Sequence, residues 1–183
     1  MPFSVLFVCT GNSCRSPMAE GMLRSMLPAE RDDIEVGSAG TAGIDGMPAT
    51  PEAVEVCLGH GIDISEHSSR GLTRELIDDS DLIFALADHH LATVSEIAPG
   101  ARTRSYLLSQ FADGSEEDVP DPIGAPVEEY ERVYRMMDGY LRDSLPRVLM
   151  LADRKTAGAG DRPGPGRAET GGAGPGRTET EAA

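Results

Sequence analysis

An eight-residue segment near the N-terminus combines the groups needed to bind and attack a tetrahedral anion. It reads CTGNSCRS, from Cys9 to Ser16, and follows the apolar run FSVLFV at residues 3–8. A loop of this length can fold so that successive backbone N–H groups point inward at one anion. The helix expected after it adds free N–H groups and the positive end of its dipole. The segment therefore predicts an anion-binding loop with a thiol at its base.

Several side chains of this loop have a chemical reason to be there. Gly11 allows the backbone to approach an anion closely, and Asn12 tolerates the left-handed conformation such a loop needs. Arg15 carries a planar guanidinium that matches two oxygens of a phosphoryl group. The Arg15 guanidinium, the inward N–H groups and the helix N-terminus favour the thiolate form of Cys9, to which Ser16 can donate a hydrogen bond. The pattern predicts covalent transfer of a phosphoryl group to sulfur.

Transfer to sulfur also needs an acid that protonates the leaving group. Asp121 lies between two prolines in the sequence VPDPIG, and rigid prolines would hold its carboxyl group over the loop. An ordinary Asp-Pro turn is the alternative interpretation. The carboxylates within residues 113–118 have the same chemistry, but this stretch contains Gly and Ser and is more typical of a solvated loop. Asp121 is therefore the candidate acid.

Alternating strand and helix patterns position these residues. Apolar runs predict strands at residues 3–8, 34–38, 81–86 and 104–108. Capping residues and prolines predict that helices begin at Ser16, Thr50, Thr73, Asp88 and Pro126. Pro146 should kink or end the last helix. Repeated strand–helix units imply an open parallel sheet with helices on both faces, and ligands beyond the carboxyl ends of the strands.

Composition excludes several classes of function. The chain has 16 Lys and Arg against 31 Asp and Glu, a formal charge of −15, which argues against binding to nucleic acid or to an anionic membrane. No apolar run approaches the roughly 18 residues of a membrane span, and no signal-peptide pattern is seen. Three cysteines are typical of a cytoplasmic protein with free thiols. The triplet Asp88-His89-His90 has no other ligand cluster at matching spacing, and neighbouring helix residues point apart, so it indicates a solvated helix start, not a metal site.

The C-terminal segment differs from the rest of the chain. Residues 157–183 are rich in Gly, Pro, Ala, Thr, Glu and Arg and contain the near-repeat GPGRAET and GPGRTET. Such a composition buries too little apolar surface to offset the entropy of ordering, so we expect a disordered tail. The chain is thus expected to comprise one folded domain, residues 1–156, and this tail.

The motif FVCTGNSCRSPMAEGML at residues 7–23 resembles the low-molecular-weight protein phosphatase family. The stretches SAGTAGIDGMPA, GIDISEHSSRGLT and PDPIG are similar to the same family, in the same order, so the resemblance covers about residues 3–150. It implies a flavodoxin-like α/β fold around four parallel strands. It also implies that Cys9 is the nucleophile, Arg15 binds phosphate and Asp121 is the general acid.

The resemblance also implies roles for the neighbouring residues. The remaining residues of the phosphate-binding loop would be Thr10, Gly11, Asn12, Ser13, Cys14 and Ser16. Asn12 and Ser16 would hold the loop in shape, with Ser38 as a hydrogen-bond partner of Asn12. The implied reaction uses no metal and no other cofactor, and its substrates are phosphorylated proteins.

The family has a branch that acts on phosphotyrosine and a branch that acts on phosphoarginine. Ser13 resembles the Thr found at this position in the arginine branch. A small hydroxyl can hydrogen-bond to a polar guanidine, whereas an aliphatic side chain would pack better on a phenol ring. Ile123 lacks the aromatic face that would stack on either planar group. The sequence therefore leaves both substrates open, with arginine about as well supported as tyrosine.

Two other functions use the same loop. Arsenate reductases of this fold pass a disulfide through further cysteines on a mobile segment, whereas Cys57 lies in a predicted helix and is expected in the core. Cys14 is close enough to Cys9 to form a protective disulfide, which would suit a phosphatase equally well. A phosphopeptide-binding module without activity should have lost Cys9 or Asp121, and both are present. The phosphatase is the preferred function.

Overall fold

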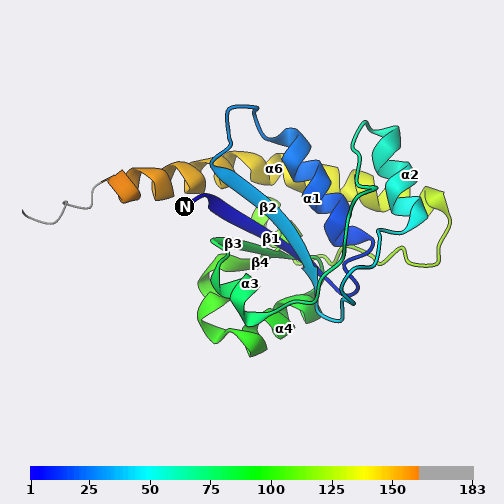
Figure 1. The fold of residues 1–183 in the computed structure, drawn as a ribbon, viewed down its shortest axis with the longest axis horizontal. Coiled ribbons are helices and arrows are strands. Elements are labelled where there is room, and N and C mark those ends of the chain that lie inside the picture. Colours follow the sequence, from blue (N-terminus) through cyan, green and yellow to red (C-terminus); the bar gives the residue numbers. More distant parts are fainter. Residues whose placement is uncertain (161–183) are drawn as a thin grey trace, which may run out of the picture.

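The computed structural model describes residues 1–160, so most of the expected tail lies outside the described residues. Four parallel strands form one sheet in the order β2-β1-β3-β4 (Figure 1). Their bounds are β1 Phe3–Cys9, β2 Ile34–Gly40, β3 Leu82–Ala85 and β4 Ser105–Leu107. The four expected strands are confirmed, and β2 runs two residues further than expected.

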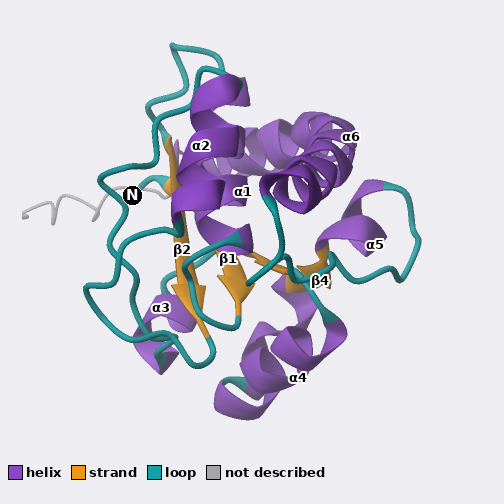
Figure 2. Cartoon of the chain, turned by 90° about the vertical axis from the view of Figure 1, so that its right-hand side faces the viewer, coloured by secondary structure: helices purple, strands orange, loops and turns teal. Residues whose placement is uncertain are grey.

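Helices cover both faces of this sheet, as expected for a flavodoxin-like fold. They are α1 Arg15–Met26, α2 Pro51–Gly59, α3 Arg74–Asp78, α4 Asp88–Ile97, the short 3₁₀ helix η1 Pro99–Arg104, α5 Leu108–Ala112 and α6 Val127–Gly160. Figure 2 shows α1, α2 and α6 on one side of the sheet and α3 and α4 on the other. Two separate apolar clusters fill the two interfaces. None of the helices described here is long and apolar enough to cross a membrane.

The alternation of side chains along β1 decides where the loop thiol points. Val5, Phe7 and Cys9 belong to the cluster beneath α1 and α6, whereas Leu6 and Val8 belong to the cluster beneath α4. Successive side chains of a strand point to opposite faces of its sheet. The sulfur of Cys9 is therefore placed on the α1 side, where the loop and the start of α1 surround it.

The helix starts are partly as expected. Thr50 accepts a hydrogen bond from the Ala53 N–H and Thr73 accepts one from the Leu76 N–H, so both predicted N-caps are confirmed. The predicted cap at Ser16 is wrong: α1 already begins at Arg15, its N-cap is Cys14, and no side chain caps it. The Ser16 hydroxyl contacts Cys9 instead.

Two further expectations about helices are corrected. Asp88 is the first residue of α4 rather than its cap, and its N–H donates to the carboxylate of Asp118 at 2.8 Å. Of the two outcomes expected at Pro146, a kink or the end of the helix, the end is wrong, because Pro146 lies within the 34 residues of α6. The helix continues to Gly160, four residues into the segment expected to be disordered; residues 161–183 lie outside the description.

Candidate active site

The loop from Cys9 to Ser16 lies at the carboxyl end of the central strand β1, as Figure 2 shows. Asn12 has φ of +54°, the left-handed conformation that the sequence predicts there. The loop is fastened to the residues after β2, because Thr41 N–H donates to Cys9 O at 2.8 Å and Ala42 N–H to Thr10 O at 2.9 Å. These backbone contacts hold the curled loop in place.

Close packing at Gly40 makes this arrangement possible. A Cβ atom at Gly40 would lie 2.6 Å from the Thr10 carbonyl oxygen and 2.9 Å from the Asn12 nitrogen. Real side chains do not approach backbone atoms so closely, so only glycine allows the end of β2 to lie against the loop. Gly40 is a supporting residue that the sequence analysis missed.

The thiol of Cys9 is buried at the base of the loop, with 2% of the residue exposed. Its sulfur lies 2.9 Å from the Ser16 hydroxyl oxygen, and the Asn12 N–H donates to it at 3.3 Å. Hydrogen-bond donors and a helix N-terminus are the groups that favour a thiolate. The predicted contact between Cys9 and Ser16 is present.

The side chain of Asn12 links the loop to the core. Its Nδ2 donates to Ser16 Oγ at 2.9 Å and to Ser38 Oγ at 2.8 Å, while its Oδ1 accepts from the Arg70 N–H at 2.9 Å. The expected contact between Asn12 and Ser38 is therefore present. His67 also fastens this residue: its Nε2 lies 2.8 Å from the Asn12 carbonyl oxygen, which can only accept, so the ring donates.

Arg15 and Asp121 meet although 106 residues separate them in the chain. Arg15 Nη2 donates to Asp121 Oδ2 at 2.6 Å, and Nη1 donates to the Val119 carbonyl oxygen at 3.0 Å. The Arg15 side chain is buried, with 4% exposed, whereas 41% of the Asp121 side chain is exposed. The Arg15 guanidinium is therefore buried behind the loop, whereas the Asp121 carboxylate is partly exposed to solvent at the opening of the candidate site.

His90 supports the loop from the α4 side. Its Nε2 and the hydroxyl of Thr10 form a hydrogen bond of 2.9 Å, and the residue is fully buried. Burial, with the nearby charges of His89 and Arg15, lowers the pKa of His90 to about 3, so the ring is neutral. The expectation that this histidine belongs to a solvated helix start is wrong. That prediction rested on the lack of further metal ligands in the sequence, whereas the contact with Thr10 arises from tertiary packing.

Ser13 and Cys14 form the α2 side of the loop. The Ser13 carbonyl oxygen accepts from the Thr50 N–H at 2.8 Å, which ties it to the start of α2. Cys14 Sγ lies 3.5 Å from the Tyr130 hydroxyl oxygen, and both residues are buried. Burial raises the pKa of Tyr130 to about 12, as expected for a tyrosine packed in the core. Ile123, by contrast, is 64% exposed beside the acid.

The chain was compared with known proteins. Residues 4–151 match the model of the family described as low molecular weight phosphotyrosine protein phosphatase. The low molecular weight protein-tyrosine-phosphatase Etp of Escherichia coli is 38% identical over 135 residues, which cover 74% of this chain and 87% of Etp. A protein-arginine-phosphatase of Geobacillus stearothermophilus is 39% identical over 131 residues, 71% of this chain and 85% of that protein.

A solved structure agrees with these relatives. The low molecular weight protein tyrosine phosphatase from T. tengcongensis superposes with a TM-score of 0.75 at 38% identity, covering 79% of this chain and 99% of that one. The family match over residues 4–151 spans the sheet, the loop from Cys9 to Ser16 and Asp121. This chain belongs to the low molecular weight phosphotyrosine protein phosphatase family.

Proposed function

We propose that the protein removes phosphate from phosphotyrosine or phosphoarginine in other proteins through a cysteinyl phosphate on Cys9. The observation that carries this proposal is the environment of the Cys9 sulfur. It lies at the base of the loop, 2.9 Å from the Ser16 hydroxyl and 3.3 Å from the Asn12 N–H. Arg15, in the same loop, pairs with Asp121. These contacts support the assignment of a nucleophile, an anion-binding group and an acid to one site.

In the first step the Cys9 thiolate attacks phosphorus in line with the leaving group. The S–P bond forms while the bond from phosphorus to the phenol oxygen or guanidine nitrogen breaks. The loop N–H groups and the Arg15 guanidinium bind the equatorial oxygens. Asp121 must be protonated for this step, so its ion pair with Arg15 is broken once Arg15 binds the phosphate. Asp121 then gives its proton to the leaving oxygen or nitrogen, which departs as a neutral group. The partial exposure of Asp121 suits this role, because the leaving group lies toward the opening.

In the second step water attacks the phosphorus of the cysteinyl phosphate. Asp121, now a carboxylate, takes a proton from the water as the P–O bond forms and the S–P bond breaks. Cys9 leaves as a thiolate, and the Ser16 hydroxyl donates to it. The product is inorganic phosphate. Each step uses only groups of this chain and water.

Ser13 is the proposed selector between the two substrates. Its backbone is fixed by the hydrogen bond from Thr50, so its side chain has a defined place in the loop. A hydroxyl there suits a guanidine, whereas an aliphatic residue would pack better on a phenol. The relatives include phosphatases named for tyrosine and for arginine, which supports both substrates.

The free cysteines support a cytoplasmic location.

The alternative of a thiol-coupled arsenate reductase is not supported. Such a reaction needs a further accessible thiol, and the only candidate outside the loop is Cys57 on α2. This residue is fully buried, and burial raises the pKa of its thiol to about 12. Cys57 is thus a core residue, as the sequence analysis expected.

The test is a paired measurement of kcat/KM on one phosphotyrosine peptide and one phosphoarginine peptide. Cys9→Ser is the blank, and it should show no turnover on either peptide. If phosphoarginine is preferred, Ser13→Ile should shift the preference toward phosphotyrosine. If phosphotyrosine is preferred, Ser13 is not the selector. Wild-type protein no faster than the blank on both peptides would contradict the proposed function.

A further inference from the structure

Glu20 on α1 completes the hydrogen-bonded network behind the loop. Its Oε2 accepts from the Ser38 hydroxyl at 2.5 Å, and its Oε1 pairs with Arg24 Nη2 at 2.6 Å. The Glu20 side chain is 14% exposed, while Ser38 is buried. None of the steps described above uses Glu20, yet a largely buried carboxylate needs partners on both oxygens. Its two contacts supply them.

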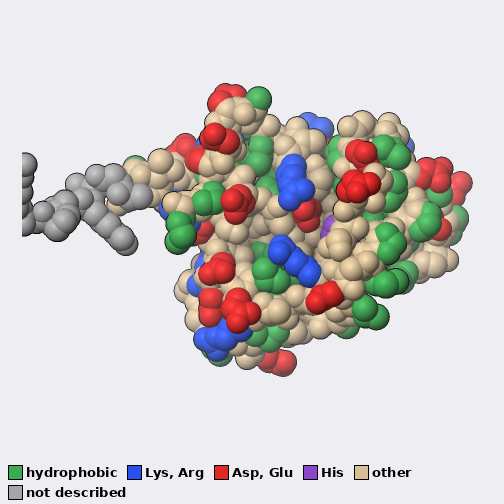
Figure 3. Space-filling view, viewed as in Figure 1, with side chains coloured by type: hydrophobic (Ala, Val, Ile, Leu, Met, Phe, Trp, Pro, Cys, Tyr) green, Lys and Arg blue, Asp and Glu red, His purple; other side chains and the backbone are tan. Residues whose placement is uncertain are grey.

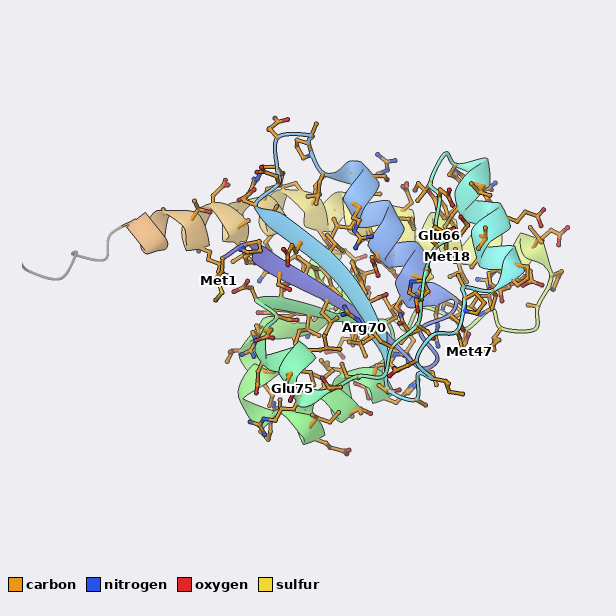
Figure 4. All side chains as sticks on the ribbon, viewed as in Figure 1. Met1, Met18, Met47, Glu66, Arg70 and Glu75 are labelled. Carbon is orange, nitrogen blue, oxygen red and sulfur yellow. The ribbon has the colours of Figure 1, made fainter. Side chains whose placement is uncertain are left out.

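The Glu20 carboxylate borders a hollow whose lining does not include Asp121, the proposed acid. This hollow has a volume of about 690 Å³ and lies between α1, β2 and the segment 61–70. Charged groups of both signs surround it, as Figure 3 shows, and Arg70 lies beside the carboxyl end of β2 (Figure 4). The charged or titratable residues lining it are Glu20, Arg24, Asp63, Glu66, His67 and Arg70. Glu20 thus has solvent on one side and the network on the other.

The direction of each hydrogen bond in the network follows from the donors available. The Arg70 N–H can only donate, so the Asn12 amide must turn its oxygen toward it, at 2.9 Å. The two hydrogens on Asn12 Nδ2 then go to Ser16 and to Ser38. Both serine oxygens therefore accept from Asn12, and both serine hydroxyls have one hydrogen left to donate.

The two remaining hydrogens have one acceptor each. Ser16 donates to the sulfur of Cys9, and Ser38 donates to Glu20. An ionised carboxylate accepts hydrogen bonds and cannot donate them. Glu20 therefore accepts the last free hydrogen, so that every donor of the network has an acceptor. A fully satisfied network of this kind is rigid.

We propose that Glu20 is a positioning residue for the nucleophile, acting through Ser38 and Asn12. Asn12 has a positive φ, a conformation that surrounding contacts must hold. The same residue donates its N–H to the Cys9 sulfur and orients the Ser16 hydroxyl. The acceptor at Glu20 anchors Ser38, Ser38 anchors Asn12, and Asn12 presents the donors that stabilise the thiolate. The inference rests on the proposed function only in taking Cys9 as the nucleophile.

Glu20→Gln tests this role because it keeps the size of the side chain. The Gln oxygen must face the Arg24 guanidinium, so its NH₂ group faces Ser38. Ser38 then meets two donors, and its own buried hydroxyl hydrogen has no acceptor, which is costly. We expect the pH midpoint of Cys9 alkylation by iodoacetamide to rise by about half a unit to one unit. We expect kcat to fall about 10-fold, with little change in KM, the scale of one charge-assisted hydrogen bond.

Arg24→Leu is the matched control. It removes the partner of Glu20 but leaves the carboxylate facing Ser38, so the alkylation midpoint should stay at the wild-type value. In the double variant, Glu20→Gln with Arg24→Leu, the amide is free to turn its oxygen toward Ser38. The midpoint should therefore return part of the way toward wild type. Thermal unfolding of all variants separates these effects from loss of the fold.

The experiment follows Cys9 by peptide mass spectrometry in the full chain. An unchanged midpoint in Glu20→Gln, or an equal shift in Arg24→Leu, would overturn the proposal. So would a double variant no closer to wild type than Glu20→Gln, even if the single variant unfolds early. The alkylation requires no phosphatase activity. Failure of the proposed function would appear instead as a wild-type protein that hydrolyses neither peptide.

Discussion

Arg15 and Asp121 form a 2.6 Å ion pair that joins the start of α1 to the loop before α6. The Arg15 side chain is buried and also donates to the Val119 carbonyl oxygen, so it holds the segment of Asp121 at two points. Asp121 Oδ1 in turn accepts from the Ile123 N–H at 3.2 Å. The proposed acid is thus positioned by a residue of the loop from Cys9 to Ser16 as well as by its flanking prolines.

Asp121→Asn should separate the role of Asp121 as acid from its role as partner of Arg15. The amide oxygen can still accept from Arg15, but the side chain cannot supply a proton. We expect kcat for a phosphotyrosine peptide to fall by about 10²- to 10⁴-fold, and by less for an aryl phosphate with an acidic leaving group. The exposed Glu116 is the control, and Glu116→Gln should keep full activity. Equal losses on both substrates would refute the acid role.

Gly40→Ala should displace the anion-binding loop. The added Cβ would lie 2.6 Å from the Thr10 carbonyl oxygen, so the end of β2 and the loop must move apart. We expect a loss of about 1–3 kcal/mol in the free energy of unfolding, with a larger proportional loss of kcat/KM. Gly139→Ala is the control, because Gly139 lies in α6 with open space around it. That variant should gain about 0.5–1 kcal/mol and keep its activity. A functional Gly40→Ala enzyme would contradict the close contact.

The pH dependence of stability should include a contribution from His90. Its pKa is about 3 in the folded protein, below the ordinary value of 6.5, mainly because of burial. Between these values the unfolded chain binds a proton that the folded chain does not. The free energy of unfolding should therefore fall as pH falls below about 6.5, by up to about 1.4 kcal/mol per unit.

Urea denaturation at a series of pH values from about 4 to about 8 measures the contribution of His90 to the free energy of unfolding. The difference between wild type and His90→Gln isolates it from the other titrating groups. The two proteins should converge in stability toward low pH, since the variant has no imidazole to protonate. Parallel profiles would show that His90 takes up a proton as easily in the fold as outside it.

Cys57 should not react in the native protein. Burial raises the pKa of its thiol to about 12, so it is protonated and inaccessible at neutral pH. Iodoacetamide should label Cys9 in the folded chain and Cys57 only after denaturation, as peptide mapping would show. Cys57→Ser should retain kcat/KM. Labelling of native Cys57, or loss of turnover in a stable Cys57→Ser protein, would revive a role in thiol exchange.

A chain ending at Thr156 should retain the turnover of the full chain. Lys155 donates to Asp81 Oδ2 at 2.6 Å and to the Pro2 carbonyl oxygen at 2.8 Å, which fastens α6 to the residues just before β3 and β1. The site lies at the opposite end of β1. Lys155→Ala should therefore lower the melting temperature without changing kcat/KM. A large loss of kcat/KM on truncation would show that residues 157–183 contribute to catalysis.

Much of the site was predictable because its chemistry is contiguous. Cys9, Asn12, Arg15 and Ser16 belong to one loop, whose spacing restricts how it can fold around an anion. The Asp-Pro pattern of Asp121 and the family resemblance that names Ser38 supplied the distant members. The helix caps at residues 16 and 88 were predicted wrongly: Ser and Asp commonly cap helices, but here Ser16 and Asp88 lie inside their helices.

By itself the sequence determined the order of strands and helices, the loop at the end of β1 and the candidate nucleophile within it. These follow from local periodicity, turn residues and the spacing of a few side chains. Only the tertiary structure decided that Glu20, His67, His90 and Gly40 surround that loop. Each reaches the loop, directly or through Ser38, by a contact between segments far apart in the chain. Such contacts depend on how the sheet and helices pack, which no local pattern encodes.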